Sequence, residues 1–340
     1  MESPDRKAGG FFMGFLIMKM KIKKILRNIC IGIISFLLLV LIVLNAGVTF
    51  KYWGFFGSTR GDFIIPGLTT AYVPQGFDYI EESDTYLMCG YMADGTSSRI
   101  YIRDEKGSTR FASLYHADGT VYDKHAGGIC HNGKYVYLAG DDGVDVFLLD
   151  EILFGGTAVM LGTIPTGHDM AYCSFYNGYL LAGNFYYPEH YETPETHRIS
   201  TPAGDQNTSL MIVYQMDVNG EFGIDPMPVA AISAPDKVQG MCFTSDDEIV
   251  LSISWSLTDS NLSFYNVDTE RVGTVQVLQG EVPLYYLDSA NLTQTVVMPP
   301  MSEELVYLDG EVLVMCESAC NKYIYGKFIR GWRVFAYDCE

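Results

Sequence analysis

Ile-Tyr-Ile-Arg-Asp at Ile100–Asp104 is the first of five apolar runs in this chain that close on Asp. The others are Val146–Asp150, Val213–Asp217, Phe264–Asp268 and Val334–Asp338. A tight-turn pair precedes each of them: Ser83-Asp84, Asn132-Gly133, Asn177-Gly178, Asp246-Asp247 and Asp309-Gly310. Asn-Gly and Asp-Gly favour hairpins because a type I′ turn needs positive φ at both central residues. Strand, turn, strand, loop and strand in repetition are typical of propeller blades. The pattern predicts an all-β protein, a β-propeller with five blades, six being the alternative.

Composition agrees with many short strands and excludes one class of partner. Aromatic residues make up 14% of the 340 residues, and there are 34 glycines. Residues 1–53 hold eight Lys or Arg and two acidic residues, which leaves a net charge of −25 on the remainder. A surface this negative repels phosphate backbones and anionic lipid headgroups, so we expect no nucleic-acid partner.

The segment Ile29–Phe50 is predicted to be a transmembrane helix. It has 22 residues without a charge, about 33 Å as a helix, which is enough to cross a hydrocarbon core of about 30 Å. Lys19, Lys21, Lys23, Lys24 and Arg27 precede it, and the positive-inside rule then places the N-terminus in the cytoplasm. Tyr52 and Trp53 follow as interfacial aromatic residues. The expected location is the cell membrane, with a single pass and the propeller outside the cytoplasm.

A cleaved signal peptide is the competing interpretation of this segment. The apolar core is long for a signal peptide, and the small-x-small cleavage pattern is poor, with Leu44 at the −3 position relative to Ala46. Met18 or Met20 are alternatives to Met1 as the start. The predicted organisation is a basic cytoplasmic N-terminus at 1–28, the helix at 29–50, a juxtamembrane linker at 51–62 and the propeller at 63–340.

Two segments fall outside the simple repeat. Phe63–Ile65 reads as a short strand with no partner nearby in sequence, and the last blade ends at Asp338 without an outer strand. Pairing the two would close the ring and remove two exposed edges. Leu284–Asp288 repeats the strand-Asp phrase only 20 residues after Asp268, which predicts an extra strand pair inside blade four.

Seven cysteines follow the apolar segment that holds Cys30, and no C-x-x-C occurs among them. Cys89 and Cys316 share an aligned position with Ala139, Ala182 and Ser252, at the end of each second strand. Small side chains suit the narrow inner part of a propeller, so buried free thiols are expected. Pairing of Cys320 with Cys316 or Cys339 is the alternative on an oxidising side.

Candidate functional residues come from the five aligned blade starts: Gln75, His125, His168, Gln239 and Glu303/Glu304. First strands line the centre of a propeller, so these positions are expected to converge on one face. His125, His168 and Glu303 together form a metal-ligand set, and calcium or zinc is the cofactor considered. The same residue types also suit general acid and base catalysis. Alternatively, they cap strand ends and bond neighbouring loops or water. The Asp of each repeat fits an Asx-turn better than a calcium ligand, because it recurs in every blade.

The chain resembles bacterial secreted or membrane-anchored propeller proteins of unassigned function. The resemblance is carried by Val73–Gly76, His125–Ile129, Pro299–Glu304 and Glu317–Ala319. More distantly, it is similar to gluconolactonase/senescence-marker-like propellers, whose channel metal is held by Glu, Asn and Asp. This chain departs from that pattern, since Gln75 and Gln239 stand where such an acid would start a blade.

Two functions follow as hypotheses. The first is a membrane-anchored propeller that binds a small molecule, a glycan or a protein at the central-channel face. Neutral Gln at two of the starts and the tyrosine-rich insertion Asn184–Ser209 motivate it. The alternative is a metal-dependent hydrolase of the lactonase or glycosidase type with its site in the channel.

Overall fold

The computed structural model describes residues 5–328 and 330–339, with residues 5–17 described as backbone only. The chain divides into two compact units, Met1–Lys51 and Tyr52–Glu340. In the first unit, the helix α1 (Asp5–Lys51) contains one segment, Met18–Lys51, that is long and apolar enough to cross a membrane, and its most apolar stretch of 18 residues has a mean hydropathy of 2.9. The helix therefore extends well beyond the expected 29–50, because the basic stretch before the apolar run is also helical.

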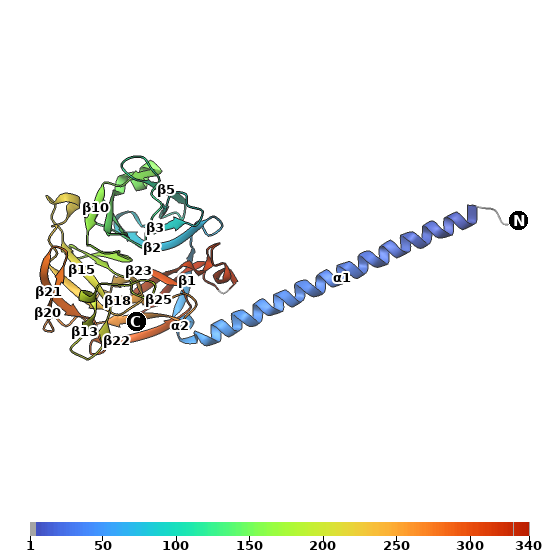
Figure 1. Cartoon of the computed structure of the whole chain (residues 1–340). Coiled ribbons are helices and arrows are strands. Elements are labelled where there is room, and N and C mark those ends of the chain that lie inside the picture. The colour runs from blue at the N-terminus through green and yellow to red at the C-terminus, as the bar shows by residue number, and fades with distance from the viewer. Residues whose placement is uncertain (1–4, 329, 340) are drawn as a thin grey trace. The chain divides into compact units, whose positions relative to one another are not determined.

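The second unit is a five-bladed β-propeller (Figure 1). Blade one holds β2 (Tyr72–Ile80), β3 (Thr85–Met92), β4 (Arg99–Arg103) and β5 (Thr109–Tyr115). Blade two holds β6 (Gly128–His131), β7 (Tyr135–Gly140), β8 (Gly143–Leu148) and β10 (Gly162–Pro165). Blade three holds β11 (Tyr172–Tyr176), β12 (Tyr179–Gly183), β15 (Ser209–Gln215) and β16 (Ala230–Ala234). Blade four holds β17 (Val238–Phe243), β18 (Ile249–Ile253), β19 (Ser260–Tyr265) and β22 (Leu292–Met298). Blade five holds β23 (Ser302–Leu308), β24 (Glu311–Cys316), β25 (Arg333–Asp338) and β1 (Thr59–Ile64).

Short elements decorate this ring. A small hairpin, β13 (Ile199–Ser200) and β14 (Gln206–Asn207), lies in the blade-three insertion. One short α-helix, α2 (Trp53–Gly57), precedes β1. Six helical turns complete the unit: η1 (Glu81–Ser83), η2 (Glu151–Gly155), η3 (Glu195–His197), η4 (Glu221–Gly223), η5 (Glu317–Ala319) and η6 (Tyr325–Phe328).

The hairpin turns form where the sequence places Asn, Asp and Gly. Asn177 and Gly178 have φ of 48° and 79°, and Asp309 and Gly310 have φ of 51° and 85°. Positive φ at both central residues is the type I′ signature, whose twist matches that of the two flanking strands. These turns fix the register between first and second strands of blades three and five.

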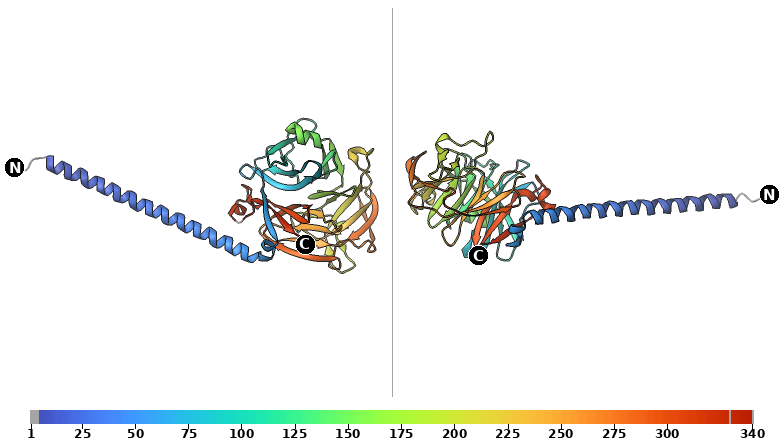
Figure 2. Two further views of the ribbon diagram at one scale, coloured as in Figure 1. Left: turned by 180° about the vertical axis from the view of Figure 1, so that it is seen from behind. Right: turned by 90° about the horizontal axis from the view of Figure 1, so that it is seen from below.

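The five first strands stand side by side around one axis, in the order β2, β6, β11, β17 and β23, and β23 meets β2 again. The views of Figure 2, from behind and from below, show the blades arranged around this axis. The aligned small residues of the second strands are all buried: Cys89, Ala139, Ala182, Ser252 and Cys316. All eight cysteines are free, so neither considered disulfide is present.

The extra strand pair of blade four belongs to the sheet of its neighbour. β20 (Gly273–Val277) and β21 (Gly280–Tyr286) form a hairpin, and β21 pairs in parallel with β16 of blade three. The prediction of a strand pair was right, but its placement inside blade four was wrong. A similar exchange occurs where β9 (Thr157–Val159), from the blade-two segment, pairs in parallel with β5 of blade one. Both exchanges bury strand edges that would otherwise be open.

Residues 52–62, expected as a linker, are part of the propeller unit. The strand β1 pairs antiparallel with β25, so the two ends of this unit meet in one sheet. Tyr52, expected as an interfacial aromatic residue, is 5% exposed, and its hydroxyl donates to Asp259 at 2.6 Å. Phe55 is buried, 5.4 Å between ring centroids from Phe335. Trp53, in contrast, is 69% exposed.

Candidate functional site

The polar residues of three of the aligned blade starts lie at register shifts near the beginning of the first strands. The shifts lie between Pro74 and Gly76 in β2, between Val238 and Gly240 in β17, and between Ser302 and Leu305 in β23. The extra residues at these places are Gln75, Gln239, and Glu303 with Glu304. A bulge re-aims a side chain and is frequent next to functional sites. The two histidines of the other blades, His125 and His168, lie in the loops before β6 and β11.

Gln75 connects His125 to an acid that the aligned starts did not include. The side-chain oxygen of Gln75 accepts a hydrogen bond from Nε2 of His125 at 2.5 Å. Its amide nitrogen donates to Oε2 of Glu317 at 2.9 Å. The ring of Tyr91 stacks on His125 with centroids 4.8 Å apart, and Nζ of Lys322 donates to the Tyr91 hydroxyl at 2.5 Å. These five residues, Gln75, Tyr91, His125, Glu317 and Lys322, are called the Gln75 cluster below.

The surroundings of His125 favour its uncharged form. The amide oxygen of Gln75 is only an acceptor, so Nε2 of His125 carries the proton and Nδ1 keeps its lone pair. Desolvation by the surrounding protein, with the nearby Lys322 charge, lowers the pKa of His125 to about 4. The residue itself is exposed at the surface, so water offsets part of this desolvation. The lowered pKa favours the uncharged imidazole at neutral pH, with Nδ1 as an acceptor available to a ligand.

Glu317 of the cluster and the neighbouring Glu303 are both buried carboxyl groups. Glu303 is 1% exposed and Glu317 is 8% exposed. Burial raises the pKa of Glu317 to about 7, although the hydrogen bond from Gln75 and the Lys322 charge oppose the rise. Burial, and then the charges of Glu317 and Glu304, raise the pKa of Glu303 well above its usual value. At neutral pH the pair therefore holds at least one proton, and Glu317 is poised to exchange its own.

Glu304 lies at the propeller axis. Its Oε1 accepts a hydrogen bond from the Met241 backbone at 2.9 Å, while Oε2 is buried without a partner among the described residues. A side chain at Gly128 would come within 2.5 Å of that Oε2, and one at Gly240 within 2.3 Å of the Glu304 Cα. Burial, and then the neighbouring Cys173, raise the pKa of Glu304 well above its usual value. The Glu304 carboxyl is therefore tightly packed at the axis, and its burial favours the protonated, uncharged form.

The other predicted residues are not gathered with this cluster. The ring of His168 lies 4.6 Å from that of His197 in the blade-three insertion, at 86° between the ring planes. Gln239 is half-buried at the β17 register shift. Within the described part of the chain, no three His, Cys, Asp or Glu side chains are arranged to hold a metal ion. Of the expected metal set, His125 and His168 thus have separate neighbours.

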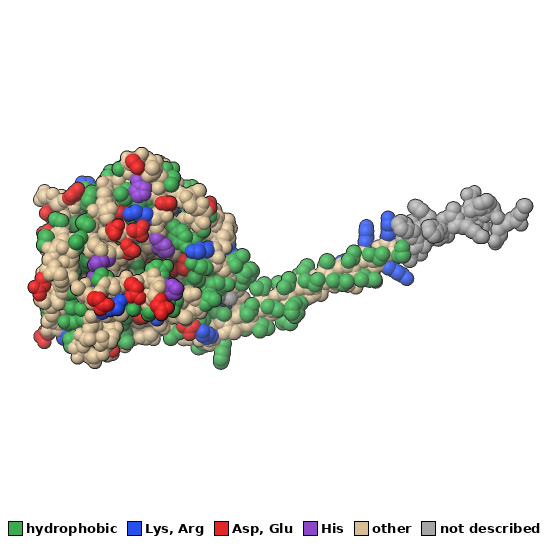
Figure 3. Space-filling model, viewed as in Figure 1, with side chains coloured by type: hydrophobic (Ala, Val, Ile, Leu, Met, Phe, Trp, Pro, Cys, Tyr) green, Lys and Arg blue, Asp and Glu red, His purple; other side chains and the backbone are tan. Residues whose placement is uncertain are grey.

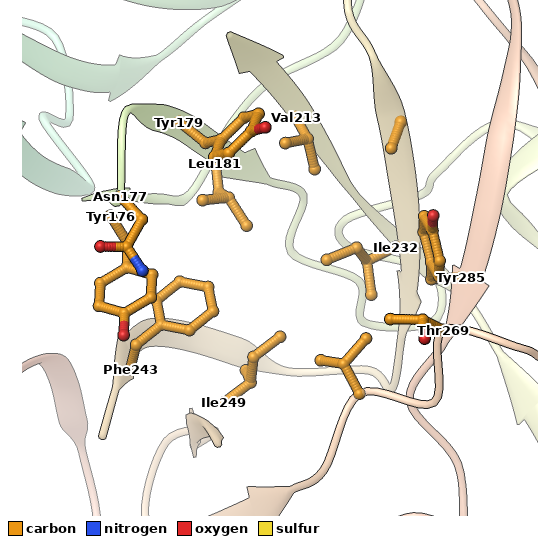
Figure 4. A pocket seen from close by; sticks show the side chains of 12 residues that line it. Tyr176, Asn177, Tyr179, Leu181, Val213, Ile232, Phe243, Ile249, Thr269 and Tyr285 are labelled. Carbon is orange, nitrogen blue, oxygen red and sulfur yellow. The ribbon is translucent and has the colours of Figure 1, made fainter. Parts of the chain in front are cut away.

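The face seen in Figure 3 carries acidic and histidine side chains over the middle of the propeller. A different kind of cavity lies between blades three and four (Figure 4). It measures about 300 Å³ and is almost wholly apolar, with Leu181, Ile232, Phe243 and Tyr285 among its walls. None of the predicted site residues lines it.

Comparisons with known proteins bear on the fold alone. No family model matches the sequence, and a search of curated proteins gives no match. The similar solved structures include a glutaminyl cyclase of Myxococcus xanthus, at 11% identity over 82% of this chain and 94% of that one, with a TM-score of 0.43. A PQQ-bound aldose sugar dehydrogenase of Streptomyces coelicolor has 13% identity over 82% and 97%, with a TM-score of 0.43. A gluconolactonase of Xanthomonas campestris has 11% identity over 82% and 95%, with a TM-score of 0.38.

The buried Glu304 carboxyl generates a prediction about stability. Its folded-state pKa is raised above the usual 4.5, so the unfolded chain loses this proton first as pH rises. The contribution of Glu304 to the free energy of unfolding is therefore fully present below pH 4.5 and is lost as pH rises toward the folded-state pKa. Glu304→Gln cannot ionise, and we expect its melting temperature to fall less than that of the wild type between about pH 5 and about pH 8.

Thermal unfolding of the full chain in detergent measures this difference. Glu270→Gln, at an exposed position, is the control and should follow the wild type. A Glu304→Gln variant whose melting temperature depends on pH as that of the wild type does would contradict the raised pKa of the Glu304 carboxyl.

Proposed function

We propose that this protein is a membrane-anchored, extracytoplasmic β-propeller that binds a small polar ligand at the Gln75 cluster. The observation that carries the proposal is the bridge through Gln75, which joins an exposed, neutral His125 to the buried Glu317. A hydrogen-bonded pair of this kind at the start of the first strands holds its side chains in fixed positions before a ligand arrives.

The exposed side of the cluster indicates the chemistry of the ligand. Nδ1 of His125 is an acceptor, Lys322 is an exposed cation, and Tyr91 offers a half-buried ring. A ligand with hydroxyl groups and an oxygen-rich or acidic end matches these groups best, and a sugar acid or a lactone is such a molecule. A protein or glycan that presents the same groups would be recognised in the same way.

We expect His125→Ala to weaken ligand binding by about tenfold and to lower the free energy of unfolding by about 1–3 kcal/mol, because it leaves the buried Gln75 oxygen without its donor. The loss of affinity reflects the hydrogen bond that the exposed imidazole would offer to the ligand. Thermal-shift screening of the full chain against monosaccharides, sugar acids and lactones, followed by calorimetry of any hit, measures both quantities.

His168→Ala is the matched control, because that ring contacts His197 and not the Gln75 cluster. Equal loss of affinity in both variants, or a hit whose binding is indifferent to His125, would contradict a site at the Gln75 cluster.

A hydrolase of the lactonase or glycosidase type is the second candidate. The specific observation in its favour is the pair of buried acids, with the pKa of Glu317 raised to about 7 by burial. A carboxyl with this pKa can donate and then accept a proton near neutral pH, as general acid–base catalysis needs. If a divalent metal takes part, Glu303, a member of this pair, and His125, which Gln75 connects to Glu317, are the two members of the predicted metal set at this site.

For the hydrolase, we expect Glu317→Gln to lower turnover of chromogenic glycosides or lactones by at least about a hundredfold. The limb of the wild-type pH profile near pH 7 should disappear with it, because the titrating group is gone. Adding a chelator to the wild type tests the metal form. Turnover that survives Glu317→Gln with its pH profile intact would remove the acid–base role.

The orientation of the anchor is a proposal from the basic residues before the apolar run. Lys19, Lys21, Lys23, Lys24 and Arg27 favour a cytoplasmic N-terminus, which places the propeller outside. Protease added to intact cells should therefore digest the chain after Trp53 and spare an N-terminal tag. Protection of the propeller until the cells are lysed would reverse this orientation.

A further inference from the structure

A pocket of about 220 Å³ lies at the outer edge of blade five, where α2, β1 and β25 meet. Its lining includes Arg60, Arg330, Arg333, Phe56, Trp332 and Phe335. Three of the 14 Lys and Arg residues in 54–340 therefore share one small pocket, in a region whose net charge is −25. The pocket is a local exception to the acidity of the domain.

The three guanidinium groups have different partners. Arg60 donates to Glu311 at 2.9 Å and lies 3.5 Å from Asp62. Arg333 donates to the Asp62 backbone carbonyl and stacks over Trp332 at 4.6 Å. Two carboxylates thus face three guanidinium groups.

Arg330 supplies the unbalanced charge. It is exposed and lies 5.0 Å over the Phe56 ring, and no ion pair to it is found in the described parts of the chain. The pocket therefore has a surplus of one positive charge, and it presents that charge beside aromatic walls. This combination suits an anionic group attached to an apolar body.

Few residues separate the first lining residue of this pocket from the last residue of α1 in the sequence. Phe56 follows Lys51, the last residue of the helix, by five residues, which is at most about 18 Å of extended chain. The first residues of the propeller unit do not form a flexible extension, because Tyr52 and Phe55 are buried in that unit. Trp53, between them, is 69% exposed, as aromatic residues at a membrane interface are. If α1 crosses the membrane, the pocket is within reach of the headgroup layer.

We propose that this pocket binds the phosphate of an anionic phospholipid from the membrane that holds α1. The proposal rests on the membrane anchor of the proposed function and is independent of the Gln75 cluster. The fork of a guanidinium group matches two phosphate oxygens, and Arg330 is placed to offer it. Phe56 and Trp332 would contact the glycerol and the first methylenes of the acyl chains. Such a contact would hold one edge of blade five at the membrane surface.

The test uses the full chain in a neutral detergent, titrated with phosphatidylglycerol, with phosphatidylcholine, or with inorganic phosphate. Native mass spectrometry counts the lipids retained, and thermal unfolding gives the stabilisation. We expect one phosphatidylglycerol per chain and a higher melting temperature, with little effect of phosphatidylcholine. Arg330→Gln should weaken phosphatidylglycerol binding about fivefold, the loss expected for one basic side chain near an anionic surface.

Arg198→Gln is the control, because Arg198 is also exposed and also lies over an aromatic ring, that of Tyr186 at 5.6 Å, but belongs to the blade-three insertion. It should bind phosphatidylglycerol like the wild type. Arg330→Lys keeps the charge without the fork and should fall between the wild type and Arg330→Gln.

Equal retention of the two lipids, or full binding by a folded Arg330→Gln variant, would overturn the proposal. Equal protection by inorganic phosphate would overturn the lipid as the source of the anion. Alkaline extraction of membranes tests the anchor separately. Release of the protein by alkaline extraction would contradict the membrane anchor. Loss of the lipid preference in detergent would contradict only the lipid site at this pocket.

Discussion

The close approach of five first strands to one axis is the constraint on which the rest of the propeller depends. Glu304 stands at this axis, and Gly128 and Gly240 are so near it that neither position has room for a side chain. The aligned second-strand positions must be small for the same reason, and they are Cys, Ala or Ser in every blade. Burial of a carboxyl group in such a space favours its neutral form, since an ion there would lose its hydration and the hydrogen bond from the Met241 backbone would offset only part of that loss.

The repeat made the fold predictable because it records two local requirements of every blade. The turn pairs need positive φ, which Asn, Asp and Gly tolerate, and the inner strands need small residues in register. The hairpin of β20 and β21 was harder to place, because pairing between blades depends on which sheet edge is open. The sequence of Leu284–Asp288 specifies a strand but carries no information about whether β16 or a closer strand is its neighbour.

The site was predictable only where it follows the repeat. Gln75 and Glu303 were found because equivalent starts were aligned, and the register shifts of β2 and β23 place both residues at such positions. Glu317 was missed as a site residue because it follows a second strand, where no candidate was sought. A signal did exist: Gly90, Gly140 and Gly183 follow the small residue of their second strands, and Glu317 replaces glycine at that place in blade five. Tyr91 and Lys322 carry no repeat signal, since loop geometry alone brings them to His125.

The hydrogen bonds of Gln75 explain why an amide stands at this position, where an acid would be a simpler metal ligand. An amide accepts from one neighbour and donates to another, so it can join a neutral imidazole to a carboxylate. A glutamate there would repel Glu317 unless the two shared a proton, and it would attract a proton to His125. The amide therefore keeps His125 neutral and leaves the titratable proton on the buried acids. That division leaves an uncharged acceptor at the exposed His125 and carboxyl groups of raised pKa at the buried Glu317 and Glu303.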